Sequence, residues 1–448
     1  MLKQLGKLLK KRTLLFRGKV SVTDGLKRQD IIKAVQQNGL SLQHIREQSA
    51  DVATTAVQQN GLALLHVLNQ TTEVCRTAIK QNPLAIQYSH NQPLDLCLLA
   101  VQKNGLALQF VRDPQFETCM SAVQQNGDAL QFVRVFNHTT CLTAVRQDGM
   151  AIRHAAIQTP EICMAAVCQN GLALRYLYDE QQHNDLCLKA VQNNGNALQY
   201  VVNQTPEICL LAVQQKGDAL RYVEQQNFQI SLAAVKQDGL SLRYVVEQSD
   251  IICLAACHQN GMALNDVINQ THQIALASVQ NNGMALSLVA TQTPEICLAA
   301  VRQNGLALID VTYQNDDICL AAVQQNHRAL IDVTDQTSCI CITAVKKDGI
   351  ALLSILHQTP EICRVAVEQS GEALQYVRDQ SDVVCMIAVK QNGLALLYVR
   401  DQTPALCLAA TSQNRDALTY IRDRNIYNIC KQEIRRNKAR DNHSSQAS

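Results

Sequence analysis

A period of 22 residues runs through most of the chain and limits its possible folds more than any other feature. The tetrad Asn-Gly-Leu-Ala recurs, and its glycine defines a reference position, position 0, from which other positions are counted. Successive reference positions lie 22 residues apart, except for one step of 24. Fifteen of the 18 glycines occupy them, so residues 29–422 form a tandem array. The reference residues are Gly39, Gly61, Pro83, Gly105, Gly127, Gly149, Gly171, Gly195, Gly217, Gly239, Gly261, Gly283, Gly305, His327, Gly349, Gly371, Gly393 and Arg415.

Each repeat contains two short segments with helical spacing of apolar residues. Apolar side chains stand at −9, −8, −5 and −4, which is one face of a helix, and again at +2, +3 and +6. Position +4 is usually polar, which excludes the alternation of a strand. Thr-Pro pairs such as Thr205-Pro206 match the N-cap and first turn of the first helix. For the second helix we expect the Asn at −1 to be the N-cap, because Pro83 at position 0 excludes a left-handed residue there.

The sequence therefore predicts an all-α solenoid of about eighteen 22-residue helical-hairpin repeats. Helices this short gain stability only by stacking, and near-constant Ala at −5 and +2 would allow close approach. Leucine-rich repeats have a similar period but require a strand, and exchangeable lipid-binding helices carry a densely charged face. Here only 17% of residues are charged, and we expect Gln and Asn to hydrate the surface. The two additional residues near Asp179 predict a longer loop.

The two ends of the chain differ in charge from the array. Residues 1–28 hold nine Lys/Arg and one Asp, and we expect them to cap the first hairpin; a membrane-surface helix or an organelle address is the alternative. Residues 423–448 are expected to form a C-terminal cap followed, after Ile434, by a basic disordered tail. Residues 29–421 hold 24 basic and 34 acidic residues, so the array is about ten charges negative. No run is apolar enough to span a bilayer, and we expect a cytoplasmic protein.

The signature A-V-x-x-N-G-x-A-L resembles that of a repeat family catalogued as a domain of unknown function. It stands here as Ala388-Val389-Lys390-Gln391-Asn392-Gly393-Leu394-Ala395-Leu396 and recurs in most repeats over about residues 29–422. The family occurs in amoeba-infecting giant viruses, intracellular bacteria and some protists, and its unit is slightly longer than 22 residues. The resemblance implies a viral or host-associated setting and an interaction role. It transfers no catalytic or binding residues.

Cysteine is unusually frequent, but its position predicts packing rather than chemistry. Fourteen of 18 cysteines stand at −8, where other repeats have Ile, Ala or Ser, so we expect buried, reduced thiols. Cys253, Cys257 and His258 are the best metal candidate, yet they are one ligand short of a structural zinc site. We therefore expect no metal and no cofactor. Aligned repeats place like residues in rows, whereas catalysis needs different groups around one pocket, so we expect no enzyme activity.

Position +5 carries the least expected pattern in the array. It is mostly aromatic or His, changes to Asp, Leu or Ser over five repeats, and then returns to Tyr. One interpretation is packing between repeats; the other is a row of residues that borders a binding surface, with an acidic segment where a basic partner docks. The predicted interaction row consists of Tyr88, Phe110, Phe132, Tyr176, Tyr200, Tyr222, Tyr244, Asp266, Asp310, Asp332, Tyr376, Tyr398 and Tyr420.

These features favour a non-catalytic scaffold that binds a protein partner. Single-stranded RNA binding is one alternative, because Tyr and His can stack on bases, although the acidic array opposes it. Peripheral membrane association through the basic N-terminus, residues 1–19, is the other. We expect neither nucleic acid nor membrane to be the main partner.

Overall fold

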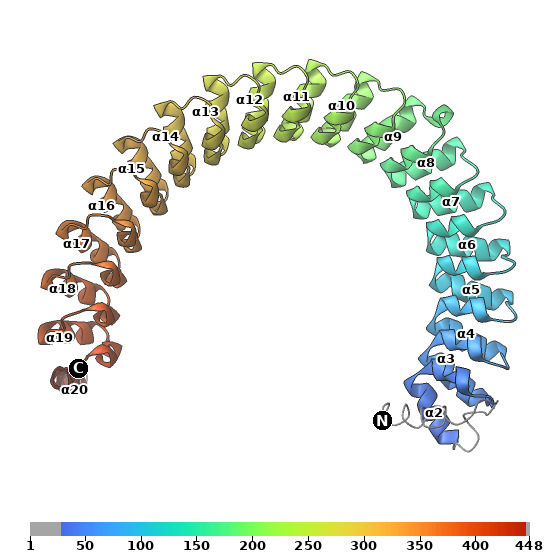
Figure 1. Cartoon of the computed structure of the whole chain (residues 1–448), viewed down its shortest axis with the longest axis horizontal. Helices are drawn as coiled ribbons and strands as arrows, with labels where there is room; N and C mark the ends of the chain where they lie inside the picture. The colour runs from blue at the N-terminus through green and yellow to red at the C-terminus, as the bar shows by residue number, and fades with distance from the viewer. Residues whose placement is uncertain (1–27, 445–448) are drawn as a thin grey trace, which may run out of the picture. The chain divides into compact units, whose positions relative to one another are not determined.

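The computed structural model of the protein describes residues 28–444, and all regular secondary structure in that range is helical (Figure 1). The all-α repeat prediction is thus confirmed. The chain divides after Gln225 into two compact units, which are described separately. Within the described range, no helix is both long enough and apolar enough to cross a membrane. The predicted N-terminal cap lies outside the described residues.

Each repeat consists of a ten-residue α-helix followed by a six-residue 3₁₀-helix. The α-helices of the first unit are α2 (Arg28–Gln37), α3 (Ala50–Gln59), α4 (Thr72–Gln81), α5 (Leu94–Lys103), α6 (Phe116–Gln125), α7 (His138–Gln147), α8 (Pro160–Gln169), α9 (Asn184–Asn193) and α10 (Pro206–Gln215). Those of the second unit are α11 (Phe228–Gln237), α12 (Asp250–Gln259), α13 (His272–Asn281), α14 (Pro294–Gln303), α15 (Asp316–Gln325), α16 (Ser338–Lys347), α17 (Pro360–Gln369), α18 (Asp382–Gln391) and α19 (Pro404–Gln413), followed by α20 (Arg424–Ser444).

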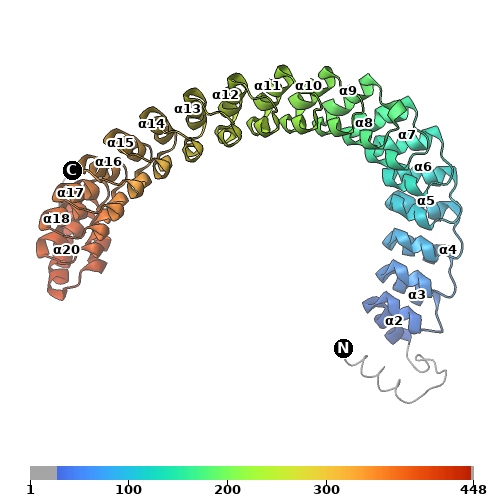
Figure 2. The same ribbon diagram turned by 45° about the horizontal axis from the view of Figure 1, so that its top comes forward.

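The 3₁₀-helices form a second layer beside the α-helices in each unit (Figures 1 and 2). In the first unit they are η1 (Gly39–His44), η2 (Gly61–His66), η3 (Pro83–Tyr88), η4 (Gly105–Phe110), η5 (Gly127–Phe132), η6 (Gly149–His154), η7 (Gly171–Tyr176), η9 (Gly195–Tyr200) and η10 (Gly217–Tyr222), with the additional turn η8 (Asp179–Gln181). In the second they are η11 (Gly239–Tyr244), η12 (Gly261–Asp266), η13 (Gly283–Leu288), η14 (Gly305–Asp310), η15 (His327–Asp332), η16 (Gly349–Ser354), η17 (Gly371–Tyr376), η18 (Gly393–Tyr398) and η19 (Arg415–Tyr420).

The second helix of the hairpin is therefore tighter than an α-helix, and its burial pattern explains why. Positions 0, +3 and +6 are buried in most repeats, as at Gly305, Leu308 and Val311. A 3₁₀-helix has three residues per turn, so these positions lie along one edge. Positions +2 and +5 share a second edge, and +1 and +4 share a third, which faces solvent. This three-edged geometry assigns each position of the 3₁₀-helix its surroundings.

Both helices of a repeat begin where the sequence predicts. Thr205 caps α10 by accepting a hydrogen bond at Oγ1 from the amide of Ile208 at 3.3 Å. Asn304 caps η14, with an extended backbone (φ −146°) and a 3.1 Å bond at Oδ1 from the amide of Leu306. Gly305 has no left-handed φ. The Asn N-cap interpretation is therefore correct.

The reference glycine is present because the next repeat lies directly against it. A Cβ added at Gly305 would lie 2.4 Å from the carbonyl oxygen of Ala322 in the following α-helix, well inside van der Waals contact. Ala322 is itself fully buried at −5. Close approach, rather than backbone conformation, therefore requires the small residue at position 0.

Two features lie outside the regular repeat. The longer connection expected near Asp179 contains the short 3₁₀ turn η8. α20 continues to Ser444, so the expectation of a disordered tail after Ile434 is wrong up to that residue. Cys430 of α20 is buried in the core that runs from Ala275 through the later repeats, and α20 thus covers the end of that core.

Candidate interaction surface

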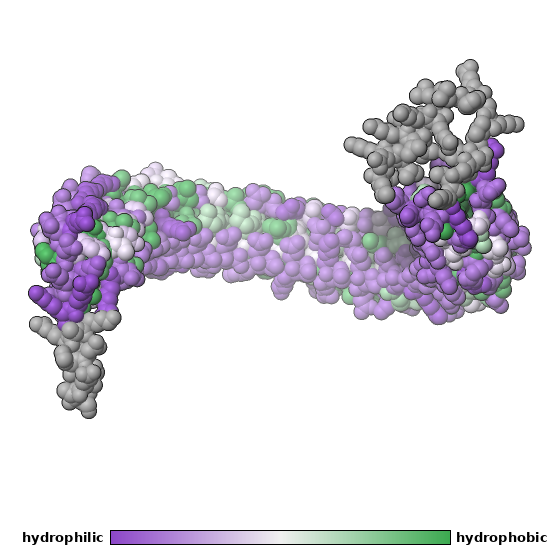
Figure 3. All heavy atoms as spheres, turned by 90° about the horizontal axis from the view of Figure 1, so that it is seen from below, coloured by the Kyte–Doolittle hydropathy of each residue, from purple (hydrophilic) through white to green (hydrophobic). Residues whose placement is uncertain are grey.

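The predicted interaction row at +5 lies along the boundary between core and solvent. Every residue of the row is the last residue of its 3₁₀-helix. Each is half-buried, because +5 shares an edge of the helix with the buried residue at +2. Successive 3₁₀-helices of a unit contact each other, so neighbouring row residues lie side by side. The structure thus places the row beside an exposed edge, formed by +1 and +4. Most of the visible face is hydrophilic, with separate apolar patches (Figure 3).

In the first unit the row is aromatic and associated with arginine. The guanidinium of Arg175 lies 5.7 Å from the ring centre of Tyr176 and 5.8 Å from that of Tyr200 in the next repeat. Arg221 lies 4.7 Å from the ring centre of Tyr222. Such cation–π contacts stabilise partly exposed aromatic residues by about 0.5–1 kcal/mol each. This part of the surface therefore combines aromatic rings with positive charge.

In the second unit the row becomes acidic, and its carboxylates differ in environment. Asp266 forms an ion pair with Arg243 at 3.6 Å. No ion pair among the side chains of residues 28–436 involves Asp310 or Asp332, although their backbone carbonyls accept hydrogen bonds from Gln292 and Gln314. The unneutralised charge of the predicted acidic segment is therefore concentrated at Asp310 and Asp332.

A row of glutamines at +9 connects adjacent repeats, a role that the sequence interpretation missed. Gln314 donates from Nε2 to the carbonyl of Asp332 at 2.8 Å and accepts at Oε1 from the amide of Thr334 at 3.0 Å. The thiol of Cys319 lies 3.4 Å from the same oxygen. The donor bond to the next repeat recurs in fourteen repeats. Pro114 and Phe136 replace this glutamine.

A second row of amides, at −2, binds the reference glycines. The amide of Gly305 donates to Oε1 of Gln325 in the next repeat at 2.7 Å, and the same bond to Gln or Asn recurs in fourteen repeats. Two of the repeats without the glycine have a lysine at the partner position: Pro83 with Lys103, and His327 with Lys347. Lys347 instead donates from Nζ to the carbonyls of Gln324 and Gln325. Glycine and amide therefore act as a pair.

The cysteines at −8 are buried, and hydrophobic surroundings suppress their ionisation. All fourteen are buried, together with Cys257 and Cys430. Burial raises the pKa of most of these thiols, to about 12 for Cys257 and, with carboxylate and thiol neighbours, to about 11 for Cys407. A raised pKa leaves little thiolate at neutral pH, which is the reactive form. The residues at −8 are thus packing residues.

We expect thiol labelling to separate the cysteines into two groups. At pH 8 the exposed Cys168 and Cys339 should react rapidly with a disulfide reagent, and the other sixteen only after denaturation. The native rate of the buried group should stay low at pH 9, because burial shields the thiols from the reagent and raises the pKa of most of them. A Cys168→Ser/Cys339→Ser variant should lack the fast phase. Rapid modification of most thiols without denaturant would contradict the assignment.

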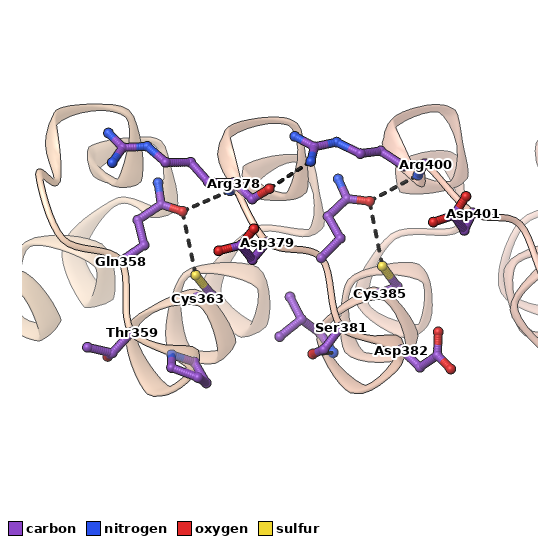
Figure 4. Close-up of a pocket in the computed structure, with 13 residues that line it drawn as sticks. Gln358, Thr359, Cys363, Arg378, Asp379, Ser381, Asp382, Cys385, Arg400 and Asp401 are labelled. Atoms are coloured by element: carbon purple, nitrogen blue, oxygen red, sulfur yellow. Dashed lines mark hydrogen bonds between the residues drawn. The ribbon is translucent and has the colours of Figure 1, made fainter.

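A polar cleft of about 480 Å³ lies between adjacent repeats of the second unit (Figure 4). Its glutamines, Gln358 and Gln380, bind the backbone of the following repeat, and Cys363 and Cys385 point to their side-chain oxygens. Arg400 donates to the carbonyl of Arg378 at 2.7 Å. The polar atoms of the cleft are therefore largely engaged in holding repeats together.

Among residues 28–436, whose side chains the structure describes, no group of three or more His, Cys, Asp or Glu could hold a metal ion. Cys253 and Cys257 are both buried in the α12 core. They therefore lie within the packing of the array.

Comparison with known families identifies similarity over part of the array. The model of a domain of unknown function (DUF4116) matches residues 159–204 and 183–226. Each match spans about two of the 22-residue repeats. No curated protein matches the chain. The predicted resemblance to an uncharacterised repeat family is thereby confirmed over residues 159–226.

Proposed function

We propose that this protein is a non-catalytic repeat scaffold that binds protein partners. One observation carries the proposal: two rows of amide bonds fix each repeat against the next, while the exposed edge beside them changes character along the array. The +4/+5 pair is Arg175-Tyr176 in the first unit and Ile309-Asp310 in the second. Since stacking does not require these differences, they are free to determine which partner binds. A cytoplasmic setting, host-associated as the family resemblance implies, is part of the proposal.

RNA binding is a second candidate, supported by the arginine–tyrosine contacts of the first unit. Stacked rings next to guanidinium groups are a common single-stranded nucleic-acid surface. Against it stands the excess of about ten acidic residues in the array, because nucleic-acid affinity depends on neutralising phosphates. The proposed membrane alternative concerns residues 1–19, outside the described range.

We expect affinity capture with the full chain to retain specific proteins after nuclease treatment. Two variants test the role of the row: Tyr222→Ala/Tyr244→Ala/Tyr376→Ala and Asp266→Asn/Asp310→Asn/Asp332→Asn. Each should change which proteins are captured, and the Asp variant should leave the melting temperature nearly unchanged, because its carboxylates are only half-buried.

Two results would count against this function. Retained material that is lost on nuclease treatment and whose binding falls steeply with salt would favour RNA. If the Tyr variant unfolds and the Asp variant captures the same proteins as the wild type, the row serves packing alone.

A further inference from the structure

The solvent-facing edge of the 3₁₀-helices has a regular chemistry in most repeats. Position +4 is polar in thirteen of eighteen repeats. Its side chain often satisfies the backbone carbonyl at +1, as in the 3.1 Å bond from Gln375 to Glu372 and the 2.9 Å bond from Ser287 to Met284. A polar +4 residue therefore contributes to the helix and to its hydration at the same time.

Three consecutive repeats have an exposed aliphatic residue at +4 instead of a polar one. Ile309, Ile331 and Leu353 occupy +4 and are 65%, 71% and 63% exposed. An aliphatic side chain cannot bind the +1 carbonyl, and it places apolar surface in water. Leu306 and Ile350, at +1 on the same edge, extend the exposed apolar surface. η14 contacts η15, and η15 contacts η16, so these side chains lie next to one another on three successive 3₁₀-helices. Contiguous exposed apolar surface of this kind marks interaction sites.

Two unpaired carboxylates flank the aliphatic residues. Asp310 and Asp332 immediately follow Ile309 and Ile331, are half-buried, and have no ion-pair partner in the described chain. Arg328, exposed at +1 of the middle repeat, is the one cation among the +1, +4 and +5 residues of these three repeats. We call Ile309, Ile331, Leu353, Asp310 and Asp332 the apolar–acidic stripe. It carries a net negative charge next to a hydrophobic row.

We propose that the apolar–acidic stripe binds a basic amphipathic helix of a partner protein. The inference rests on the proposed scaffold function and names the chemistry of one partner. Stacked repeats lie roughly 9–10 Å apart, and seven residues of an α-helix rise about 10.5 Å. A partner helix with an apolar residue every seven positions therefore meets Ile309, Ile331 and Leu353 in succession. Lys or Arg residues flanking that seam face Asp310 and Asp332.

The position of the stripe within its unit suits such a ligand. In the second unit the 3₁₀ layer lies on the inner side of the curve that its repeats follow (Figures 1 and 2). The inner surface of a solenoid unit can contact an elongated ligand over several repeats. Three repeats match three apolar residues at heptad spacing in the partner.

A fluorescein-labelled helical peptide of about three heptads, with a Leu seam flanked by Lys, is the probe. Titrated with the full chain, it should show saturable anisotropy. An Ile309→Gln/Ile331→Gln/Leu353→Gln variant should bind it at least about tenfold more weakly. Gln is the residue at +4 in six other repeats, so this variant should keep the melting temperature of the wild type. Asp310→Asn/Asp332→Asn should weaken binding and reduce its salt dependence.

Matched control variants carry the same types of substitution outside the apolar–acidic stripe. Leu65→Gln replaces an exposed +4 leucine of the first unit, and Glu247→Gln removes an exposed carboxylate outside the stripe. Neither should change peptide affinity. A peptide with its Lys residues replaced by Glu, and one with the Leu seam scrambled, should bind at least about tenfold more weakly.

Defined outcomes overturn the inference. Absence of saturable peptide binding does so, as does unchanged affinity in the Gln and Asn variants. Single-stranded RNA that binds the wild type and is lost in the Gln variant would assign the stripe to nucleic acid. If the peptide fails but nuclease-resistant capture of proteins persists, the stripe proposal alone is wrong; if specific capture also fails, the scaffold function is wrong.

Discussion

Replacing Gly305 by Ala is expected to lower the free energy of unfolding of the second unit by about 2 to 3 kcal/mol, the cost of overpacking a tight contact. The new Cβ would meet the Ala322 carbonyl oxygen at 2.4 Å and Oε1 of Gln325 at 3.0 Å. The next repeat must move away, which also weakens the 2.7 Å bond between the Gly305 amide and Gln325. In an ordinary helix the same substitution would be stabilising by about 0.5–1 kcal/mol. Urea unfolding followed by circular dichroism, with hydrogen exchange to locate the change, measures the effect.

The neighbouring residue provides the control. Leu306→Ala shortens a side chain that is already 39% exposed and should change stability by less than about 1 kcal/mol. Conversely, His327→Gly with Lys347→Gln should create the glycine–amide pair of the other repeats and slow exchange at the new glycine amide. Unaltered unfolding of Gly305→Ala would show that the stack tolerates a methyl group and that close approach does not determine the glycine.

The repeat boundaries and the first helix could be predicted because their signals are redundant. Eighteen repeats follow a 22-residue period with one step of 24, and Thr-Pro pairs define the start of helices such as α10 and α14. Apolar residues at −9, −8, −5 and −4 identify one face of an α-helix without ambiguity. The N-cap residues of the two helices, at −12 and −1, could be predicted from the chemistry of their side chains alone. Local rules suffice wherever each contact lies within one repeat.

The tighter geometry of the second helix was harder to predict from its length. Six residues make too few turns for apolar spacing to separate three residues per turn from 3.6. The period was nevertheless present, because small or apolar residues stand at 0, +3 and +6, as at Gly283, Leu286 and Val289. Glycine was taken as the first residue of the second helix and not as a buried contact, which hid the first member of that edge.

The abundant amides were interpreted as surface hydration, and this was only partly correct. Gln325 and Gln314 are fixed by their bonds to adjacent repeats, and their partners lie about one repeat away in sequence. The spacing of apolar residues along a helix reflects burial of that helix and does not predict side-chain hydrogen bonds to another repeat. The chain did hold a signal: Lys347 stands at the Gln position where His327 replaces glycine. Comparing deviant repeats with each other would have revealed the pairing.

The candidate surface was predicted in part. The half-buried row at +5, such as Tyr398 and Asp332, has the burial expected at the edge of an apolar stripe. Position +4 was described only by its usual polar character, so the three consecutive repeats with Ile309, Ile331 and Leu353 at this position were not recognised. Individual departures from a repeat consensus carry the information about binding, whereas the consensus carries the fold.

Substituting Ala for Gln314 is expected to uncouple η15 locally from the preceding repeat. The substitution removes the 2.8 Å bond to the Asp332 carbonyl and the 3.0 Å bond from the Thr334 amide. Because water can reach Thr334 and replace part of these bonds, we expect a loss of about 1–3 kcal/mol. The Thr334 amide should then exchange at least about tenfold faster, as measured by hydrogen exchange.

The geometry of the lost bonds defines both the comparison and the decisive outcome. Gln314→Glu keeps an acceptor for the Thr334 amide but cannot donate to the Asp332 carbonyl, so its effect should be intermediate. Gln324→Ala makes the same change at an exposed position of α15 and should leave Thr334 protected. Pro114 and Phe136 already replace this glutamine, so the corresponding amides of Arg134 and Ala156 should exchange faster than Thr334 in the native protein. Equal protection of Thr334 in the wild type and in Gln314→Ala would mean that side-chain packing alone holds the repeats in register.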